Sequence, residues 1–157
     1  TEFLLLPMFY QQITGHTIEE DGISVISCNG ISYKRYLEIA QATDKRIAVV
    51  TDNDEKNARI AEAASFNQAN DLQHIFMGAT VDEWTWEACI YKENKDTLDG
   101  MIDVQAGAAY KFHDKDYGAV LGKMLNHKVD VAYQMLTSGK TFVVPQYIKD
   151  AIGWLRE

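Results

Sequence analysis

The sequence predicts an α/β fold, in which a parallel sheet is flanked by helices and followed by a C-terminal helical extension. Three segments of the first half, 22–28, 47–51 and 72–77, are rich in the apolar and β-branched residues of strands. Helical patterns separate these segments, and strands that alternate with helices indicate a parallel sheet. After Tyr117 the patterns are helical. The 157 residues fit one domain, which at this size buries roughly 70% of the unfolded chain's surface.

The first predicted element is a buried helix over residues 2–13. Glu2 is the only charge ahead of its long apolar face, and an acid at a helix start commonly just complements the helix dipole. The strand at 22–28 leads to a turn at Asn29-Gly30. Ser32 is predicted to cap the helix that follows this turn.

The central strand carries the main functional prediction. Four apolar residues, Ile47-Ala48-Val49-Val50, run into a cluster of carboxylates, and such a run predicts a strand buried on both faces of the sheet. Asp52 and Asp54 follow at its carboxyl end, where open α/β sheets bind their ligands. Residues i and i+2 of an extended chain point the same way, so both carboxylates can face one site. They repel each other unless a cation or a proton separates them, which predicts a site for Mg²⁺ or Mn²⁺.

Two other interpretations of this stretch stay open. Asp52 or Asn53 can instead cap the next helix, predicted over 55–64, as part of a solvated turn. An acidic pair after a strand also occurs in receiver-type phosphoacceptor domains, in which Asp52 would be the acceptor. That interpretation requires a lysine at the end of a later strand, whereas Lys128 lies in a helical stretch.

A second candidate region follows the third predicted strand, Leu72–Met77. Glu87 lies there among aromatic residues, in the run Trp84–Tyr91. A lone glutamate in such company is either a surface acid or a held ligand, and burial would raise its pKa unless a cation compensates. The helical extension is predicted over 117–125, 128–136 and from Pro145 onward.

Composition and charge argue against a generic nucleic-acid binder, a disulfide-rich or zinc protein and a membrane protein. The chain has 15 basic and 23 acidic residues and a net charge of −8, whereas a generic nucleic-acid binder carries a basic face. A metal-dependent nuclease is still compatible with this charge, because bound cations neutralise its acidic ligands. Cys28 and Cys89 form neither a disulfide framework nor a zinc pattern. This use of cysteine leads us to expect a reduced, cytoplasmic compartment. No apolar run approaches the roughly 20 residues of a membrane span, so we expect no membrane partner.

Six pieces of the chain follow one pattern in their order and spacing. They are Thr1–Pro7, Gly22–Ile26 with Asn29-Gly30, Val49–Asp54, Thr85–Ala88, His127–Ala132 and Val143–Ile152. With these pieces the chain resembles, over almost its whole length, the Toprim domain of OLD-family (overcoming lysogenization defect) nucleases, a group that includes the nuclease subunit of Gabija phage defence. Topoisomerases and primases share the Asp-x-Asp piece, whereas the Thr-x-Glu and lysine-containing pieces are specific to the OLD group.

The resemblance implies a Rossmann-like Toprim fold and a Mg²⁺- or Mn²⁺-dependent DNA endonuclease with two ions, one activating water and the other stabilising the leaving oxygen. It assigns metal binding to four acids, Glu2, Asp52, Asp54 and Glu87. It assigns catalysis to Glu2, Asp52 and Lys128, and Lys128 would neutralise the charge that develops on the scissile phosphate. Without the resemblance, a lysine at a helix start is expected to point into solvent. Thr51 would orient water or a ligand.

Part of the family pattern is missing from the sequence. Thr1–Pro7 resembles the end of a Glu-Gly-x-x-Glu motif whose first Glu and Gly would precede Thr1, together with a strand and an ATPase domain. We therefore expect residues 1–157 to be a Toprim nuclease domain from a longer protein, in which only the absent ATPase domain binds ATP. The resemblance also implies DNA as substrate, homo-oligomers formed through the full-length protein and a partner in phage defence. The alternative is a non-catalytic Toprim-like module for assembly or regulation, favoured by the acidic charge and the incomplete motif.

Overall fold

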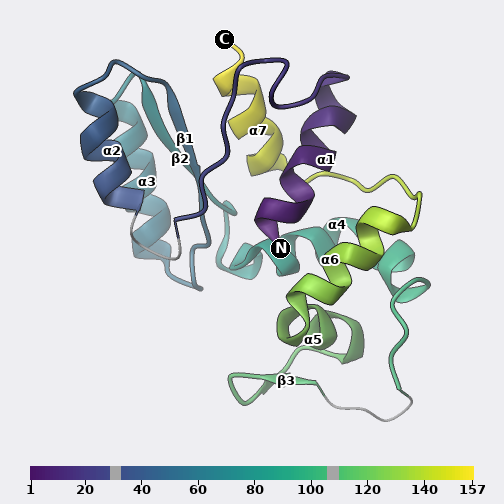
Figure 1. The fold of residues 1–157 in the computed structure, drawn as a ribbon. Helices are drawn as coiled ribbons and strands as arrows, with labels where there is room; N and C mark the ends of the chain where they lie inside the picture. The colour runs from purple at the N-terminus through teal and green to yellow at the C-terminus, as the bar shows by residue number, and fades with distance from the viewer. Residues whose placement is uncertain (29–32, 106–109) are drawn as a thin grey trace.

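The computed structural model describes residues 1–28, 33–105 and 110–157, and Figure 1 shows how their helices and strands are arranged. The α-helices in these ranges are α1 (Glu2–Thr14), α2 (Tyr33–Gln41), α3 (Asn57–Ala69), α4 (Trp86–Asp99), α5 (Ala119–Asn126), α6 (Lys128–Thr137) and α7 (Gln146–Leu155). The strands are β1 (Ile47–Val50), β2 (Gln73–Phe76), β3 (Lys111–Phe112) and β4 (Lys115–Asp116), and Val81–Glu83 forms a 3₁₀ turn, η1. The predicted turn at Asn29-Gly30 and the predicted cap at Ser32 lie outside the described residues. In the ranges described, no helix has both the length and the apolar character to cross a membrane.

Strands β1 and β2 pair in parallel and form a two-stranded sheet. Ile47 lies opposite Gln73 and Val50 lies opposite Phe76, with α3 connecting the two strands. Helices α2 and α3 cover one face of the pair and α7 covers the other (Figure 1). The predicted α/β fold, with helices flanking a parallel sheet, is therefore confirmed. All four residues of β1 are half-buried, not buried as the apolar run predicts, because in the described part of the chain this sheet has two strands and each has an open edge.

The predicted strand over residues 22–28 is wrong. The segment alternates in exposure as a strand does: Ile23 and Val25 pack on the main core, whereas Ser24 and Ile26 face solvent. It joins no ladder with another described segment. Alternating exposure needs only an extended chain with one buried side, but a strand also needs a neighbour whose backbone groups pair with its own. The local sequence pattern shows that one side of the segment is buried, but it does not show whether a neighbouring strand pairs with it.

The main core lies among α1, α4, α5, α6 and α7. Its largest fully buried side chains are aromatic: Trp86, Tyr10, Phe9 and Phe142. Phe9 stacks on Trp86 with ring centroids 6.0 Å apart, which joins α1 to α4. Helix α1 ends at Gly15, whose φ of 76° is a left-handed conformation that favours glycine. Helices α5, α6 and α7 form the predicted extension, with bounds within two residues of the predicted ones.

The chain turns sharply between β1 and α3. Asp54 and Glu55 both have positive φ, 54° and 59°, a conformation that residues with a Cβ rarely adopt. Helix α3, predicted over 55–64, consequently begins at Asn57 and continues to Ala69. Its N-cap is Lys56, which makes no side-chain capping bond, so the acidic turn does not serve to cap this helix.

Candidate functional site

Residues from four different elements meet beside the carboxyl end of β1. Asp52 directly follows β1, Glu2 is the first residue of α1, Glu87 lies in the first turn of α4, and Lys128 is the first residue of α6. The N-terminus lies beside α4 and α6 in Figure 1. The helix dipole favours acids at helix starts, which accounts for Glu2 and Glu87. It disfavours a lysine there, so the position of Lys128 requires a tertiary contact to explain it.

Glu87 is fully buried, and donors from three residues satisfy its carboxylate. The Thr1 hydroxyl donates to Oε1 at 2.7 Å, and the Thr85 hydroxyl donates to Oε2 at 2.8 Å. The Lys128 ammonium also donates to Oε2, with Nζ 3.0 Å from that oxygen. Burial by itself would raise the pKa of Glu87, but the Lys128 ammonium and the two hydroxyls hold that pKa below its ordinary value. Glu87 is therefore a buried, ionised carboxylate at the centre of the site.

Asp52 lies against the start of α4. Its Oδ1 accepts a hydrogen bond from the backbone N–H of Trp86 at 2.9 Å, so the end of β1 is joined to the residue before Glu87. Burial, followed by the negative charges of Glu87 and Glu2, raises the pKa of Asp52 to about 6. The Trp86 N–H and the Lys128 ammonium oppose this rise. The site therefore holds more negative charge than its one ammonium balances, and a bound cation would relieve this excess.

Two further residues of the predicted site contact a different partner. Asp54 is half-exposed, and its carboxylate forms an ion pair with Arg59 of α3. The left-handed turn at Asp54 breaks the extended geometry that would keep its side chain parallel to that of Asp52. Thr51 accepts a hydrogen bond from the same guanidinium, with Arg59 Nη2 3.4 Å from Oγ1. The structure thus groups Glu2, Asp52, Glu87 and Lys128, and it places Asp54 and Thr51 on Arg59.

Asn53 anchors the turn that carries Asp52. Its side chain is fully buried, and its Nδ2 donates to the carbonyl oxygens of Gly78, Thr80 and Glu83 at 3.1, 2.8 and 3.1 Å. Its Oδ1 accepts the backbone N–H of Glu55 at 3.0 Å. The segment between β2 and α4 is thereby fixed to the end of β1. These bonds hold Asp52 and Glu87 in position relative to each other.

Three residues without a predicted role in the site lie at it: Thr85 and Asn53, which support it, and Tyr147, which lies nearby. A threonine directly before a helix is a common N-cap, but the Thr85 hydroxyl bonds to Glu87 in place of the helix backbone. Tyr147 of α7 lies close by, and its pKa is raised well above the ordinary value by burial, then by Cys89, Asp52 and Glu2. In the sequence, the Thr-x-Glu spacing is the signal that could have identified Thr85 as part of the site. No local pattern separates Asn53 from a solvated turn residue, or Tyr147 from a core tyrosine.

The donor chemistry of the group fits a hard divalent cation. Mg²⁺ takes oxygen ligands and is commonly held by one or two carboxylates, while waters and substrate phosphates complete its shell. Asp52 and Glu87 are such carboxylates, and the charge of Glu2 acts on Asp52 and Lys128. Over the ranges that the structure describes, no three His, Cys, Asp or Glu side chains form a metal-binding cluster. The fit is therefore to an ion held by one or two of these acids and completed by other ligands.

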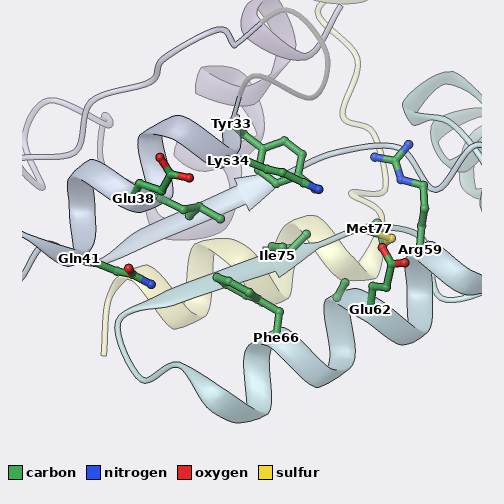
Figure 2. A pocket seen from close by; sticks show the side chains of 11 residues that line it. Tyr33, Lys34, Glu38, Gln41, Arg59, Glu62, Phe66, Ile75 and Met77 are labelled. Atoms are coloured by element: carbon green, nitrogen blue, oxygen red, sulfur yellow. The ribbon is translucent and has the colours of Figure 1, made fainter.

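A separate hollow of about 310 Å³ lies between α2 and α3, over the sheet. Figure 2 shows Phe66 and Ile75 at its floor and the charged side chains of Lys34 and Arg59 at its margins. Arg59 is the residue that pairs with Asp54, so the hollow borders the turn after β1. The four grouped residues of the candidate site do not line it. The hollow and the candidate site are therefore distinct features.

Comparison with known proteins matches the first third of the chain to a protein family. Residues 1–54 match the family model described as overcoming lysogenization defect protein-like, TOPRIM domain. The matched segment contains Glu2, Asp52 and Asp54, and it ends before Glu87 and Lys128. No curated protein and no solved structure matched the chain.

Proposed function

We propose that this chain, whose residues 1–54 match the OLD-like TOPRIM family model, is a Toprim domain of the OLD family that cleaves DNA as a Mg²⁺- or Mn²⁺-dependent endonuclease. A Toprim domain indicates a metal-binding module of the nuclease or primase type. Within that class, we propose endonuclease activity. The observation that carries it is the ion pair between the buried Glu87 and the partly exposed Lys128, beside Asp52. It supplies acids for a divalent ion and a cation for a phosphate in one place.

Each residue of the group has a separate role in this proposal. Asp52 and Glu87 would hold the metal, with Glu2 adding negative charge nearby. Bound in pairs, such ions activate water and stabilise the leaving oxygen of a phosphodiester. Lys128 would stabilise the charge that develops on the phosphate, and its side chain is 38% exposed where that of Glu87 is fully buried. Thr1 and Thr85 orient the Glu87 carboxylate by their hydrogen bonds.

The net charge of −8 affects how DNA would be bound. Phosphate contacts usually come from a basic face, so in our proposal bound cations and other parts of a longer protein supply most of them. We propose that this setting includes an ATPase domain that binds ATP, further copies of the chain and a partner in phage defence. The resemblance in motif order supports this setting.

Nicking of supercoiled plasmid DNA in Mn²⁺ tests the proposed activity. Asp52→Asn and Glu87→Gln should each lower the nicking rate at least about a hundredfold, the loss typical of one preorganised electrostatic contact in an active site. Glu93→Gln is the matched control, because Glu93 is an exposed glutamate on the same helix as Glu87. It should nick DNA at the wild-type rate, and circular dichroism should show all three variants folded.

Two results would contradict the proposal in different ways. Nicking that survives in both site variants would mean that these acids do not carry the activity. A wild-type chain that binds Mn²⁺ but does not nick DNA, alone or within the longer protein, would favour the alternative of a non-catalytic module for assembly or regulation.

A further inference from the structure

Lys128 contacts the most deeply buried acid of the site. Its Nζ lies 3.0 Å from Glu87 Oε2, and Glu87 is 0% exposed. A buried carboxylate without a counter-charge is strongly unfavourable. The ammonium therefore accounts for how the protein keeps Glu87 ionised inside the fold. It shares Oε2 with the Thr85 hydroxyl, while Oε1 accepts the Thr1 hydroxyl.

We propose that Lys128 is a built-in substitute for the metal: its ammonium holds Glu87 in place before a divalent cation binds, and it leaves Glu87 when the cation binds. The inference rests on the proposed function, because it takes Asp52 and Glu87 as metal ligands. It goes beyond that function by assigning an order, in which Lys128 turns to the phosphate only after metal has entered.

The balance of charge supports competition between the two cations. Glu2, Asp52 and Glu87 bring three negative charges against the one positive charge of Lys128, which leaves −3 + 1 = −2 when all are ionised. A divalent cation would neutralise this excess better than the ammonium does. Two cations on one carboxylate repel strongly at such short range. The mobile partner is the lysine, because its flexible stem is partly exposed and can carry the ammonium toward solvent.

Mn²⁺ affinity provides a test that does not depend on cleavage. In Lys128→Met the competing charge is gone and the apolar stem is kept, so Mn²⁺ should bind at least about tenfold more tightly than to the wild type, measured by calorimetry or by the electron paramagnetic resonance of free Mn²⁺. Lys140→Met removes an exposed lysine elsewhere and is the matched control. Without metal, Lys128→Met should have a lower Tm than the wild type. Saturating Mn²⁺ should raise the Tm of Lys128→Met by more than it raises the Tm of the wild type.

A second measurement uses the wild-type chain, so it does not depend on the variant folding. Lysines are labelled briefly with an amine-acetylating reagent, with and without Mn²⁺, and labelling of Lys128 is compared with that of Lys140 by mass spectrometry. Release from Glu87 should increase labelling of Lys128 several-fold in Mn²⁺ and leave Lys140 unchanged.

The outcomes separate this inference from the proposed function. If the wild type binds Mn²⁺ but Lys128→Met binds it no more tightly, or if Mn²⁺ fails to increase labelling of Lys128, the competition is refuted and the nuclease proposal stands. If neither chain binds Mn²⁺, the ligand assignment fails and both proposals fail with it.

Discussion

At the scale of single residues, the position of the acids depends on one buried amide. Asn53 is 0% exposed, and its Nδ2 is shared by three backbone carbonyl oxygens of the segment between β2 and α4. The adjacent backbone adds a further link, since the N–H of Asp54 donates to the carbonyl oxygen of Trp84 at 3.2 Å. Asp52 and Glu87 lie on opposite sides of this junction. Asn53 therefore holds the two acids in relation to each other, together with the hydrogen bond from the Trp86 N–H to Asp52.

Substitution of Asn53 should consequently affect both stability and metal binding. Asn53→Ala removes a fully buried amide that donates to the carbonyl oxygens of Gly78, Thr80 and Glu83, and we expect the free energy of unfolding to fall by about 2–4 kcal/mol. Urea unfolding measures this loss, and calorimetry should show weaker Mn²⁺ binding under conditions where the variant is folded. The control is Asn57→Ala, at an exposed position at the start of α3, which should change stability by no more than about 0.5 kcal/mol. Equal effects of the two substitutions would show that the amide is not the anchor.

At the scale of elements, a second polar junction joins the segment after α1 to the end of α7. Asp21 follows α1 and accepts a hydrogen bond from the Tyr10 hydroxyl at 2.5 Å. It also contacts His16 Nδ1 at 2.9 Å and Arg156 Nε, after α7, at 3.1 Å. The hydrogen bonds from Tyr10 and His16, with the charge of Arg156, lower the pKa of Asp21. Burial, and then Asp21 itself, raises the pKa of Tyr10 to about 12.

This junction should make stability depend on pH in a definite direction. The pKa of Asp21 is lower in the folded than in the unfolded chain, so its contribution is complete above the unfolded pKa of about 3.9. The contribution is lost as pH falls through the folded pKa. Asp21→Asn should therefore be less stable than the wild type at pH 7, and this difference should shrink as urea unfolding is repeated below about pH 4. Asp82→Asn, at an exposed position in η1, should show no such trend. A difference from wild type that is constant with pH would mean that Asp21 acts through packing alone.

The same elements show how far a sequence predicts this fold. Helices α1, α5, α6 and α7 follow from apolar spacing, Gly15 and Pro145, because these signals act within a few residues. The extended segment at 22–28 has the local pattern of a strand, but whether a neighbouring strand pairs with it depends on the rest of the molecule. Likewise, the i, i+2 rule places Asp54 beside Asp52 only while the chain stays extended, and the turn at Asp54 ends that condition.

At the scale of the whole molecule, the apolar residues form two unequal cores. The larger core lies among α1, α4, α5, α6 and α7. The smaller has Leu37, Ala63 and Ile75 as its buried members and lies where α2 and α3 cover the sheet. The candidate site spans the boundary, since Asp52 comes from the sheet and Glu87 from the larger core. A site assembled from both parts is complete only while they are packed together.

The unequal cores predict that the part around α2 opens at a lower free energy than the rest. Burial of apolar surface is the main stabilising term, and the smaller core buries far less of it. In native-state hydrogen exchange, the amides of Leu37 and Ala40 should report an opening free energy at least about 1.4 kcal/mol below that of Ile90 in α4. Their exchange should also depend less on added denaturant, because a partial opening exposes less surface. Mn²⁺ bound between Asp52 and Glu87 should narrow this difference, since opening the sheet would cost the ion a ligand. Identical free energies and denaturant slopes for α2 and α4 would instead establish one cooperative unit, and Mn²⁺ would then protect both helices alike.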